Sequence, residues 1–486
     1  MKISRKLGAA LFLPVIINPV MEISCSSSPV MKKKPVNILF LLADDERAGT
    51  INSLGNSEII TPNLDKLVRK GTSFTHAYIM GGSQGAVSVP SRAMIMTGRF
   101  LSHLEKTGTV IPEDQIMLCE VLKKAGYNTH GIGKWHNGPE SYARSFLSGS
   151  EIFFGGMTDQ FNVNVWNFDP SGKYKADSVL NQPHINKNKH SSELFADAAV
   201  NFLKNYKKDK PFFLYVAFTS PHDPRKMPPE YLKMYDTAKI KLPPNFMPQH
   251  NFDNGELKVR DELLAGFPRT IPEIKGHIRD YYAMITHLDA QIGRIIDALK
   301  ESGEYENTII IFSGDNGLAL GQHGLMGKQN VYEHSVGVPL IWSGPGIPEN
   351  QKRDAFVYLL DIYPTICEII GIKVPDSVDG TSIKQCILDK NAQIRTSLYF
   401  SYRDFQRSVR DREYKLIEYN VSGKRTTQLF NIGADPWEKN NLADDPEYRN
   451  KLKSMRKAML EQKKLTDDNG PFWEGIDFIK ETDSLY

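Results

Sequence analysis

The chain has 486 residues, more than a single compact core usually organises, so we expect two domains. Its formal net charge is +3 at pH 7, although 24% of its residues are charged. A balance so close to neutral argues against nucleic acid as a partner, and it is compatible with a small anionic substrate.

The first 34 residues have the composition of a targeting segment. Basic residues precede an apolar run at 7–20, which is typical of a secretory signal and short for a membrane span. Cys25 then precedes a serine-rich linker, in a setting that resembles a bacterial lipoprotein cleavage site. We therefore expect secretion across the inner membrane into the periplasm, either as a lipoprotein anchored through Cys25 or after plain cleavage.

The apolar segment 36–43 suits a strand buried on both faces of a parallel sheet. It ends in Asp44 and Asp45, adjacent carboxylates that repel each other unless a cation lies between them. Taken alone, the pair also fits two solvated acids in a loop. Further along, Pro62 is expected to open a helix.

Residues 88–99 form a second distinctive stretch. Pro90 suits the first turn of a helix, Ser88 suits a capping position, and the free N–H groups of such a helix end attract anions. Arg92 lies four residues after Ser88 and can share its face of the helix. These features alone also describe an ordinary capped helix.

Strands and helices alternate as far as residue 374. We expect strands at 127–130, 211–219, 307–312 and 337–343, and helices at 118–125, 192–206, 280–301 and 361–370. Two long stretches, 137–192 and 223–275, show little periodicity and are expected to be insertions over the strand ends. This alternation predicts an α/β fold with a doubly wound sheet and helices on both faces.

The pattern changes after about residue 374. Short alternating runs at 397–402, 405–409, 414–419 and 426–430 predict a smaller antiparallel sheet, and a helix is expected at 445–464. We therefore expect a larger domain at 35–374 and a C-terminal α+β subdomain at 375–486.

Polar side chains follow several of the predicted strands, where ligands of such sheets bind. They are Asp44 and Asp45, Lys134 and His136, His222, and Asp315 and Asn316. The aspartates and Asn316 offer only oxygen ligands, which suit Ca²⁺ or Mg²⁺ better than Zn²⁺. The sequence therefore predicts a cation site at this edge of the sheet.

The twelve residues from Ser88 to Arg99 resemble the signature of the type I sulfatases, Cys/Ser-x-Pro-Ser-Arg-x-x-x-x-Thr-Gly-Arg. Further resemblances are Gly-Lys-Trp-His at 133–136, Ser-Pro-His at 220–222, the metal-binding segment at 313–317 and the tail element at 435–442. Asn137 departs mildly from the family, which often continues with Leu-Gly. The resemblance covers about residues 35–445 and implies an alkaline-phosphatase-like fold with a catalytic domain at 35–374.

The resemblance also implies a mechanism. Ser88 would be oxidised to formylglycine by a serine-type maturation enzyme, and its hydrate would attack sulfur. Ca²⁺ is favoured over Mg²⁺, held by the predicted oxygen ligands together with residue 88. Arg92, Lys134 and Lys328 would offset the sulfate charge. His222 would protonate the leaving oxygen, and His136 would deprotonate the second hydroxyl to expel sulfate.

The function expected from these residues is hydrolysis of sulfate esters on a sulfated carbohydrate such as a glycosaminoglycan, mucin or algal glycan. The alternatives are a phosphomonoester or phosphodiester hydrolase of the same superfamily and a non-catalytic sulfoglycan-binding protein. Candidate substrate contacts in the insertions and later loops are Arg225, Arg260, Arg269, His323, Arg403 and Arg407.

Overall fold

The computed structural model describes residues 1, 8, 35–174, 184–185, 188–207 and 209–478. The strand predicted at 36–43 lies inside a large mixed sheet. The strands of this sheet are β1 (Asn37–Asp44), β2 (Gly71–Tyr78), β4 (Asn128–Lys134), β5 (Ser148–Phe153), β8 (Phe212–Pro221), β9 (Thr308–Gly314), β10 (Gly337–Ser343), β11 (Gln351–Arg353) and β12 (Val357–Tyr358). Their order is β11-β2-β10-β9-β1-β8-β4-β5, with β12 beside β2. The expected signal peptide and Cys25 lie outside the described residues.

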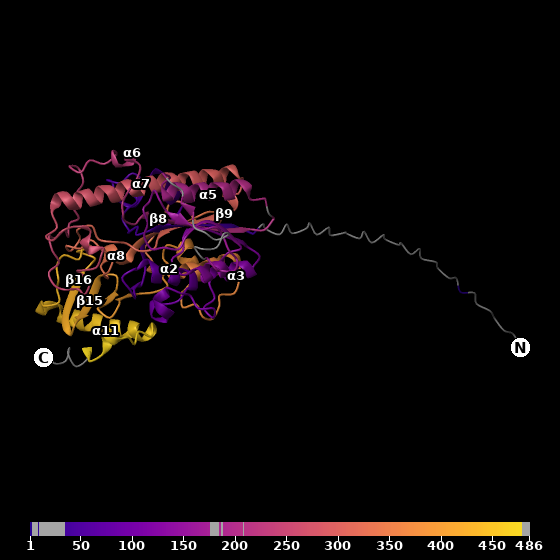
Figure 1. The fold of residues 1–486 in the computed structure, drawn as a ribbon. Coiled ribbons are helices and arrows are strands. Elements are labelled where there is room, and N and C mark those ends of the chain that lie inside the picture. The colour runs from indigo at the N-terminus through magenta and orange to yellow at the C-terminus, as the bar shows by residue number, and fades with distance from the viewer. Residues whose placement is uncertain (2–7, 9–34, 175–183, 186–187, 208, 479–486) are drawn as a thin grey trace. The chain divides into compact units, whose positions relative to one another are not determined.

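Helices cover both faces of the large sheet (Figure 1). They are α1 (Pro62–Arg69), α2 (Ser88–Thr97), α3 (Leu118–Lys124), α4 (Pro139–Ser145), α5 (Ser191–Asn205), α6 (Pro229–Leu232), α7 (Ile271–Glu301), α8 (Glu333–Val336), α9 (Ile362–Ile370), α10 (Lys384–Leu388) and α11 (Arg449–Leu465). Figure 1 shows α5 and α7 on one side of β8 and β9, and α2 and α3 on the other.

The side chains of β1 explain why the sheet needs cover on both faces. Leu39 and Leu41 belong to the hydrophobic core that includes α5 and α7. Phe40 and Leu42 belong to the core on the opposite face, with residues of α2 and α3. A strand that is apolar on both faces must be buried on both, and this confirms the predicted fold class.

A second, smaller sheet forms in the C-terminal region, as predicted. Its strands are β13 (Leu398–Tyr402), β14 (Gln406–Arg410), β15 (Tyr414–Val421) and β16 (Lys424–Asn431), which pair antiparallel in chain order. The short strand β3 (Gly81–Gly82) joins its edge in parallel with β13. The segment just before Ser88 is therefore tied to the C-terminal sheet. The domain boundary at residue 374 stays a prediction.

Several expected elements differ from those observed. The stretch 137–192 contains α4 and β5, and a minor ladder joins β6 (Asn164–Val165) to β7 (His184–Ile185). The strand expected at 127–130 runs on to Lys134, because β5 and β8 supply hydrogen-bond partners on both sides. The helix expected from residue 280 begins at Ile271, since Ile274 and Ile278 in its first turns pack into a separate small core.

The strand β2 is a further element that local periodicity did not predict. It pairs with β10, and β10 runs antiparallel to both β2 and β9 while the central strands are parallel. None of the helices that the structure describes is long and apolar enough to cross a membrane.

Candidate active site

The carboxyl ends of four strands of the large sheet lie close together. Asp44 is the last residue of β1 and Lys134 is the last residue of β4, while His222 directly follows β8 and Asp315 directly follows β9. These strands run parallel to one another, so their carboxyl ends lie at the same edge of the sheet. The structure therefore brings together side chains from four segments that are distant in the sequence.

Ser88 lies beside this cluster, at the start of α2. Val87 occupies the N-cap position and no side chain caps the helix, so the expected capping role of Ser88 is wrong. The Ser88 hydroxyl oxygen instead lies 3.1 Å from Asp44 Oδ1 and 3.1 Å from Asn316 Oδ1. Lys328 Nζ lies 3.4 Å from the same oxygen. The hydroxyl therefore faces charged side chains and not its own helix backbone.

Three buried carboxylates are matched by three buried cations around Ser88. The pairs are Lys134 Nζ with Asp44 Oδ2 at 2.6 Å, Lys328 Nζ with Asp45 Oδ1 at 2.5 Å, and Arg92 Nε with Asp315 Oδ2 at 2.8 Å. Oxygen atoms of the three aspartates all lie within 4.8 Å of one another. Without any ligand the formal charges of these six groups cancel, so a divalent cation would leave the site positive.

The same carboxylates fit a hard divalent cation. Burial raises the pKa of Asp315 to about 6 despite Arg92, and repulsion from Asp44 and Asp45 adds to the shift. Burial also opposes the charge of Asp44, but Lys134, His222 and Arg92 outweigh it and hold its pKa below the usual value. A cation between these groups would relieve their crowding, and the donor atoms present are oxygens, which suit Ca²⁺ or Mg²⁺.

The two predicted histidines reach the site from β4 and β8. Burial, with Lys134 and Arg92 nearby, lowers the pKa of His136 well below 6.5, so its ring is neutral at neutral pH. A Cβ at position 156 would lie 2.9 Å from His136 Nε2, so Gly156 leaves the ring its space. His222 Nε2 lies 3.6 Å from Asp45 Oδ2.

A cavity of about 270 Å³ opens onto these groups. Its lining residues are Gly85, Ala86, Ser88, His136, Gly156, Met157, His222, Val259, Arg260, Asp261, Lys328 and Gln329. The insertions at 137–192 and 223–275 thus supply part of the wall, as expected. Three lining residues were not predicted from the sequence: Met157, Asp261 and Gln329. The sequence offered one signal for Asp261 and Gln329, which directly follow the candidate residues Arg260 and Lys328. It offered none for Met157.

Most of the predicted substrate contacts lie elsewhere. Among the candidate arginines only Arg260 lines the cavity. Arg225 lies over the ring of Tyr281, and Arg403 is paired with Glu256. Arg269 and Arg407 are buried in ion pairs with Glu262 and Asp468, so their charges are already matched.

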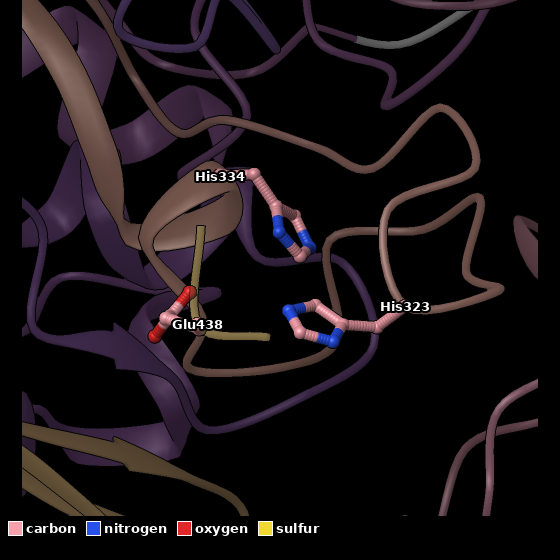
Figure 2. Close-up of side chains that lie close together, drawn as sticks. All are labelled: His323, His334 and Glu438. Atoms are coloured by element: carbon pink, nitrogen blue, oxygen red, sulfur yellow. The ribbon is translucent and has the colours of Figure 1, made fainter. Parts of the chain in front are cut away.

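His323 is buried and does not line the cavity either. Its ring stacks on Tyr332 with centroids 4.0 Å apart. Figure 2 shows it facing His334 and Glu438, and ligand atoms of the three residues lie within 4.8 Å of one another. The Glu438 carboxylate, however, lies 2.9 Å from the buried ammonium of Lys415, which would repel a metal ion. We therefore assign this cluster a packing role.

Similarity to known proteins extends over most of the chain. A family model described as Sulfatase matches residues 36–372, and one described as N-sulphoglucosamine sulphohydrolase, C-terminal, matches residues 321–465. A sulfatase of Formosa agariphila is 31% identical, covering 89% of this chain and 87% of its own length. An N-acetylglucosamine-6-O-sulfatase of Bacteroides thetaiotaomicron is 27% identical, covering 92% and 90%.

A solved structure shares the architecture. BT4656 in complex with its substrate D-glucosamine-2-N,6-O-disulfate superposes with a TM-score of 0.77 at 25% identity. The match covers 91% of this chain and 100% of the other. The similarity in fold therefore extends over most of the chain.

Proposed function

We propose that this chain, which belongs to the sulfatase family and is a sulfuric ester hydrolase, removes sulfate from a carbohydrate through a formylglycine made from Ser88 and with a bound Ca²⁺ ion. The observation that carries the proposal is the position of Ser88. Ser88 lines a cavity, and its hydroxyl oxygen lies 3.1 Å from both Asp44 Oδ1 and Asn316 Oδ1 and 3.4 Å from Lys328 Nζ. A reacting group at this position would face both the cation ligands and a positive charge.

The residues that would hold the cation are Asp44, Asp45, Asp315 and Asn316, with an oxygen on residue 88. When bound, the ion would withdraw negative charge from the sulfate oxygens. The Asn316 amide supports this arrangement, because its Nδ2 donates to Asp45 Oδ1 at 2.7 Å while its Oδ1 points to Ser88. The Oδ1 atom of Asn316 is therefore oriented toward residue 88.

Three cations of the chain bind and orient the sulfate in this proposal. Lys134, Lys328 and Arg92 are buried, so their charges act in a medium that screens them weakly. Arg92 also donates from Nη1 to the backbone carbonyl of Lys134 at 2.8 Å, which fixes the guanidinium against the end of β4. A preorganised set of this kind stabilises negative charge without reorienting during the reaction.

Two histidines would move the protons. Formylglycine, as its hydrate, would supply the hydroxyl that attacks sulfur. His136 is neutral at neutral pH and lines the cavity, so it is suited to accept a proton from residue 88. His222 lines the same cavity and would donate a proton to the leaving sugar oxygen.

The carbohydrate substrate is supported by two relatives. The Bacteroides relative is an N-acetylglucosamine-6-O-sulfatase, and BT4656 binds a disulfated glucosamine. A cavity of about 270 Å³ lies near the lower end of the range for small-ligand sites. We therefore propose that one sulfated sugar unit occupies it.

The test is sulfate release from a panel of defined sulfated saccharides by protein matured in its native host. We expect at least one saccharide to be desulfated with a kcat/KM well above that for the matching phosphate ester. Faster release of phosphate would favour a phosphoester hydrolase. Binding of the saccharides without sulfate release would favour a glycan-binding protein.

We also propose that residues 1–34 direct secretion to the periplasm, with Cys25 carrying a lipid anchor, and that a serine-type maturation enzyme acts on Ser88. Charge and apolar patterning support the first part, and serine at the head of the signature supports the second. Mass spectrometry of the peptides containing Cys25 and Ser88 tests both modifications in one preparation.

A further inference from the structure

We propose that Gln160, a residue of the insertion at 137–192, is a positioning residue for His222, because its side-chain amide holds the backbone of His222 in place. The inference rests on the proposed function, since His222 is the proton donor of that proposal. It goes further because Gln160 is buried and is not among the residues that line the cavity. Gln160 can therefore act on the reaction only through other residues.

The partners of the Gln160 amide fix its orientation. Nε2 donates to the backbone carbonyl oxygen of His222 at 3.2 Å. Because a carbonyl oxygen only accepts hydrogen bonds, the amide must present its nitrogen to His222. Oε1 accepts from the hydroxyl of Ser191 at 2.6 Å and lies 2.9 Å from the hydroxyl oxygen of Thr219. Both ends of the amide are therefore bound, and a rotation that exchanged them would place two acceptors, Oε1 and the His222 carbonyl, against each other.

Gln160 joins the start of α5 to the end of β8. Ser191 is the first residue of α5, and its backbone N–H donates to the backbone carbonyl of Gln160 at 2.7 Å. Thr219 belongs to β8, and its hydroxyl oxygen lies 2.8 Å from that of Ser191. The exposed fractions of Gln160, Ser191 and Thr219 are 1%, 0% and 2%. Water cannot readily replace a bond at such a site, so loss of the amide leaves buried polar groups without partners.

Support from outside the strand matters for His222, because it lies beyond the last residue of β8. Its backbone N–H donates to the carbonyl of Thr219 at 3.1 Å, and its ring Nδ1 lies 2.7 Å from the carbonyl oxygen of Asp223. These two contacts stay within residues 219–223 and shape a local turn. The bond from Gln160 spans 62 positions and ties this turn to a different segment of the protein.

The loop that carries Gln160 also contacts the lysine at the end of β4. The backbone carbonyl of Gly156 accepts from Lys134 Nζ at 2.7 Å, and Met157 lines the cavity. The loop at 156–160 therefore contacts the carboxyl ends of both β4 and β8. Gln160 is the residue through which this loop bonds to His222.

The size of the effect follows from the geometry of proton transfer. A proton donor must lie within hydrogen-bond distance of the leaving oxygen, and a displacement of about 1 Å can cost about 100-fold in rate. Without the Gln160 donor we therefore expect a loss of about 10- to 100-fold on an ester with a poor leaving group. A group that acts in the transition state affects kcat more than KM, so the loss should fall on kcat. This split separates positioning of His222 from weaker substrate binding.

The experiment uses matured protein and two aryl esters, phenyl sulfate and 4-nitrophenyl sulfate. Phenolate is the poorer leaving group and needs a proton more than nitrophenolate does. Wild type, Gln160→Met, His222→Ala and the double variant are compared, since methionine has nearly the length of glutamine but donates no hydrogen bond. We expect Gln160→Met to lower kcat about 10- to 100-fold on phenyl sulfate and less than about 3-fold on 4-nitrophenyl sulfate. In the His222→Ala background the same change should cost little more, which a double-mutant cycle measures as coupling.

A second variant and a matched control keep the test independent of misfolding. Ser191→Ala removes the hydroxyl that donates to Gln160 Oε1 but leaves the amide, so it should show the same pattern with a smaller loss. The control is Asn37→Leu. Asn37 is a buried amide at the start of β1, away from the site, and its Oδ1 accepts from the backbone N–H of Phe212 at the start of β8 at 3.0 Å. This control should lose stability to urea, as Gln160→Met does, but keep the wild-type ratio of kcat on the two esters.

The contrary outcomes are distinct. Additive losses in the double-mutant cycle would make Gln160 a purely structural residue and overturn the inference, as would the same loss on phenyl sulfate in Asn37→Leu as in Gln160→Met. Strong coupling between Gln160 and His222 with equal losses on both esters would keep the positioning role and refute the acid role of His222 in the proposed function. Cleavage of the aryl sulfates without desulfation of any saccharide would refute the carbohydrate substrate alone.

Discussion

The Nδ1 atom of His222 lies 2.7 Å from the backbone carbonyl oxygen of Asp223. A carbonyl oxygen only accepts hydrogen bonds, so Nδ1 carries a proton, while Nε2 lies 3.6 Å from Asp45 Oδ2. His222 can therefore donate a proton from Nε2 only when the ring is doubly protonated.

The first prediction follows from this arrangement. A sugar alkoxide is a poor leaving group and needs a proton, whereas nitrophenolate leaves readily without one. In His222→Ala and His222→Gln we expect kcat/KM for a sulfated sugar to fall about 10²- to 10⁴-fold, with a much smaller loss for 4-nitrophenyl sulfate. Equal losses on both substrates would remove His222 from the acid role and make it a sulfate-positioning residue.

The second prediction concerns maturation of Ser88. Mass spectrometry of the peptide that contains residue 88 from the native host should detect an aldehyde in place of the serine side chain. Ser88→Cys should gain activity in hosts that modify only cysteine, and Ser88→Ala should be inactive in every host. Full activity from protein that carries only unmodified serine would contradict the proposed chemistry.

The third prediction concerns the cation. Asp315→Asn keeps a hydrogen-bond acceptor for Arg92 but removes a charged ligand, so we expect kcat/KM to fall on the order of 10³-fold. Chelation should have the same effect on the wild type, and Ca²⁺ should restore activity better than Zn²⁺. Better restoration by Zn²⁺ would show that the argument from oxygen donors is wrong.

Stability must be measured beside activity in this series. Arg92 is 1% exposed, so removal of its partner leaves a buried charge that costs about 3–5 kcal/mol when nothing replaces the carboxylate. We therefore expect Asp315→Ala to unfold at lower urea than Asp315→Asn. The matched control is Asp289→Asn. Asp289 is a buried residue of α7 outside the site, and its carboxylate accepts a hydrogen bond from the backbone N–H of Leu64. This variant should lose stability and keep its activity.

The fourth prediction concerns the dependence of stability on pH. Burial, with His287 beside it, lowers the pKa of His190 from 6.5 to about 3. The neutral ring uses both nitrogens, because Nδ1 accepts from the backbone N–H of Ser192 and Nε2 donates to the carbonyl of Lys226. Its contribution to stability is fully present above pH 6.5 and is lost as pH falls towards 3, because the unfolded chain takes up the proton first.

The measurement is urea unfolding of the wild type and His190→Asn between pH 7.5 and pH 5. Asparagine keeps a capping oxygen but does not titrate, so the free energy of unfolding of the variant should fall less steeply on acidification, by up to about 1.4 kcal/mol per pH unit. The test rests on the difference between the two proteins, because other buried groups also change stability with pH. Burial raises the pKa of Asp289 and Glu46, so their contribution to stability increases as pH falls, opposite to that of His190. Parallel curves would contradict the prediction.

The sequence by itself determined the fold class and the residues that gather at the strand ends. The segment at 36–43 is apolar on both faces, which requires helices on both sides of a sheet, and β1 lies between two cores. Polar residues directly follow the strands, and parallel strands present their carboxyl ends together. These inferences needed only neighbours along the chain and the period of the side chains.

The tertiary structure decided which groups pair and what Ser88 faces. The contact between the Asp45 backbone N–H and the Asp315 carboxylate spans 270 positions, so no local pattern contains it. Ser88 was expected to cap its helix, but the carboxyl ends of β1 and β9 bring Asp44 and Asn316 within 3.1 Å of its hydroxyl oxygen. The cavity wall likewise depends on an insertion folding back, so that Asp261 accepts a hydrogen bond from Gln329. Long-range pairing of this kind is set by strand order and packing, which hydrophobic periodicity does not encode.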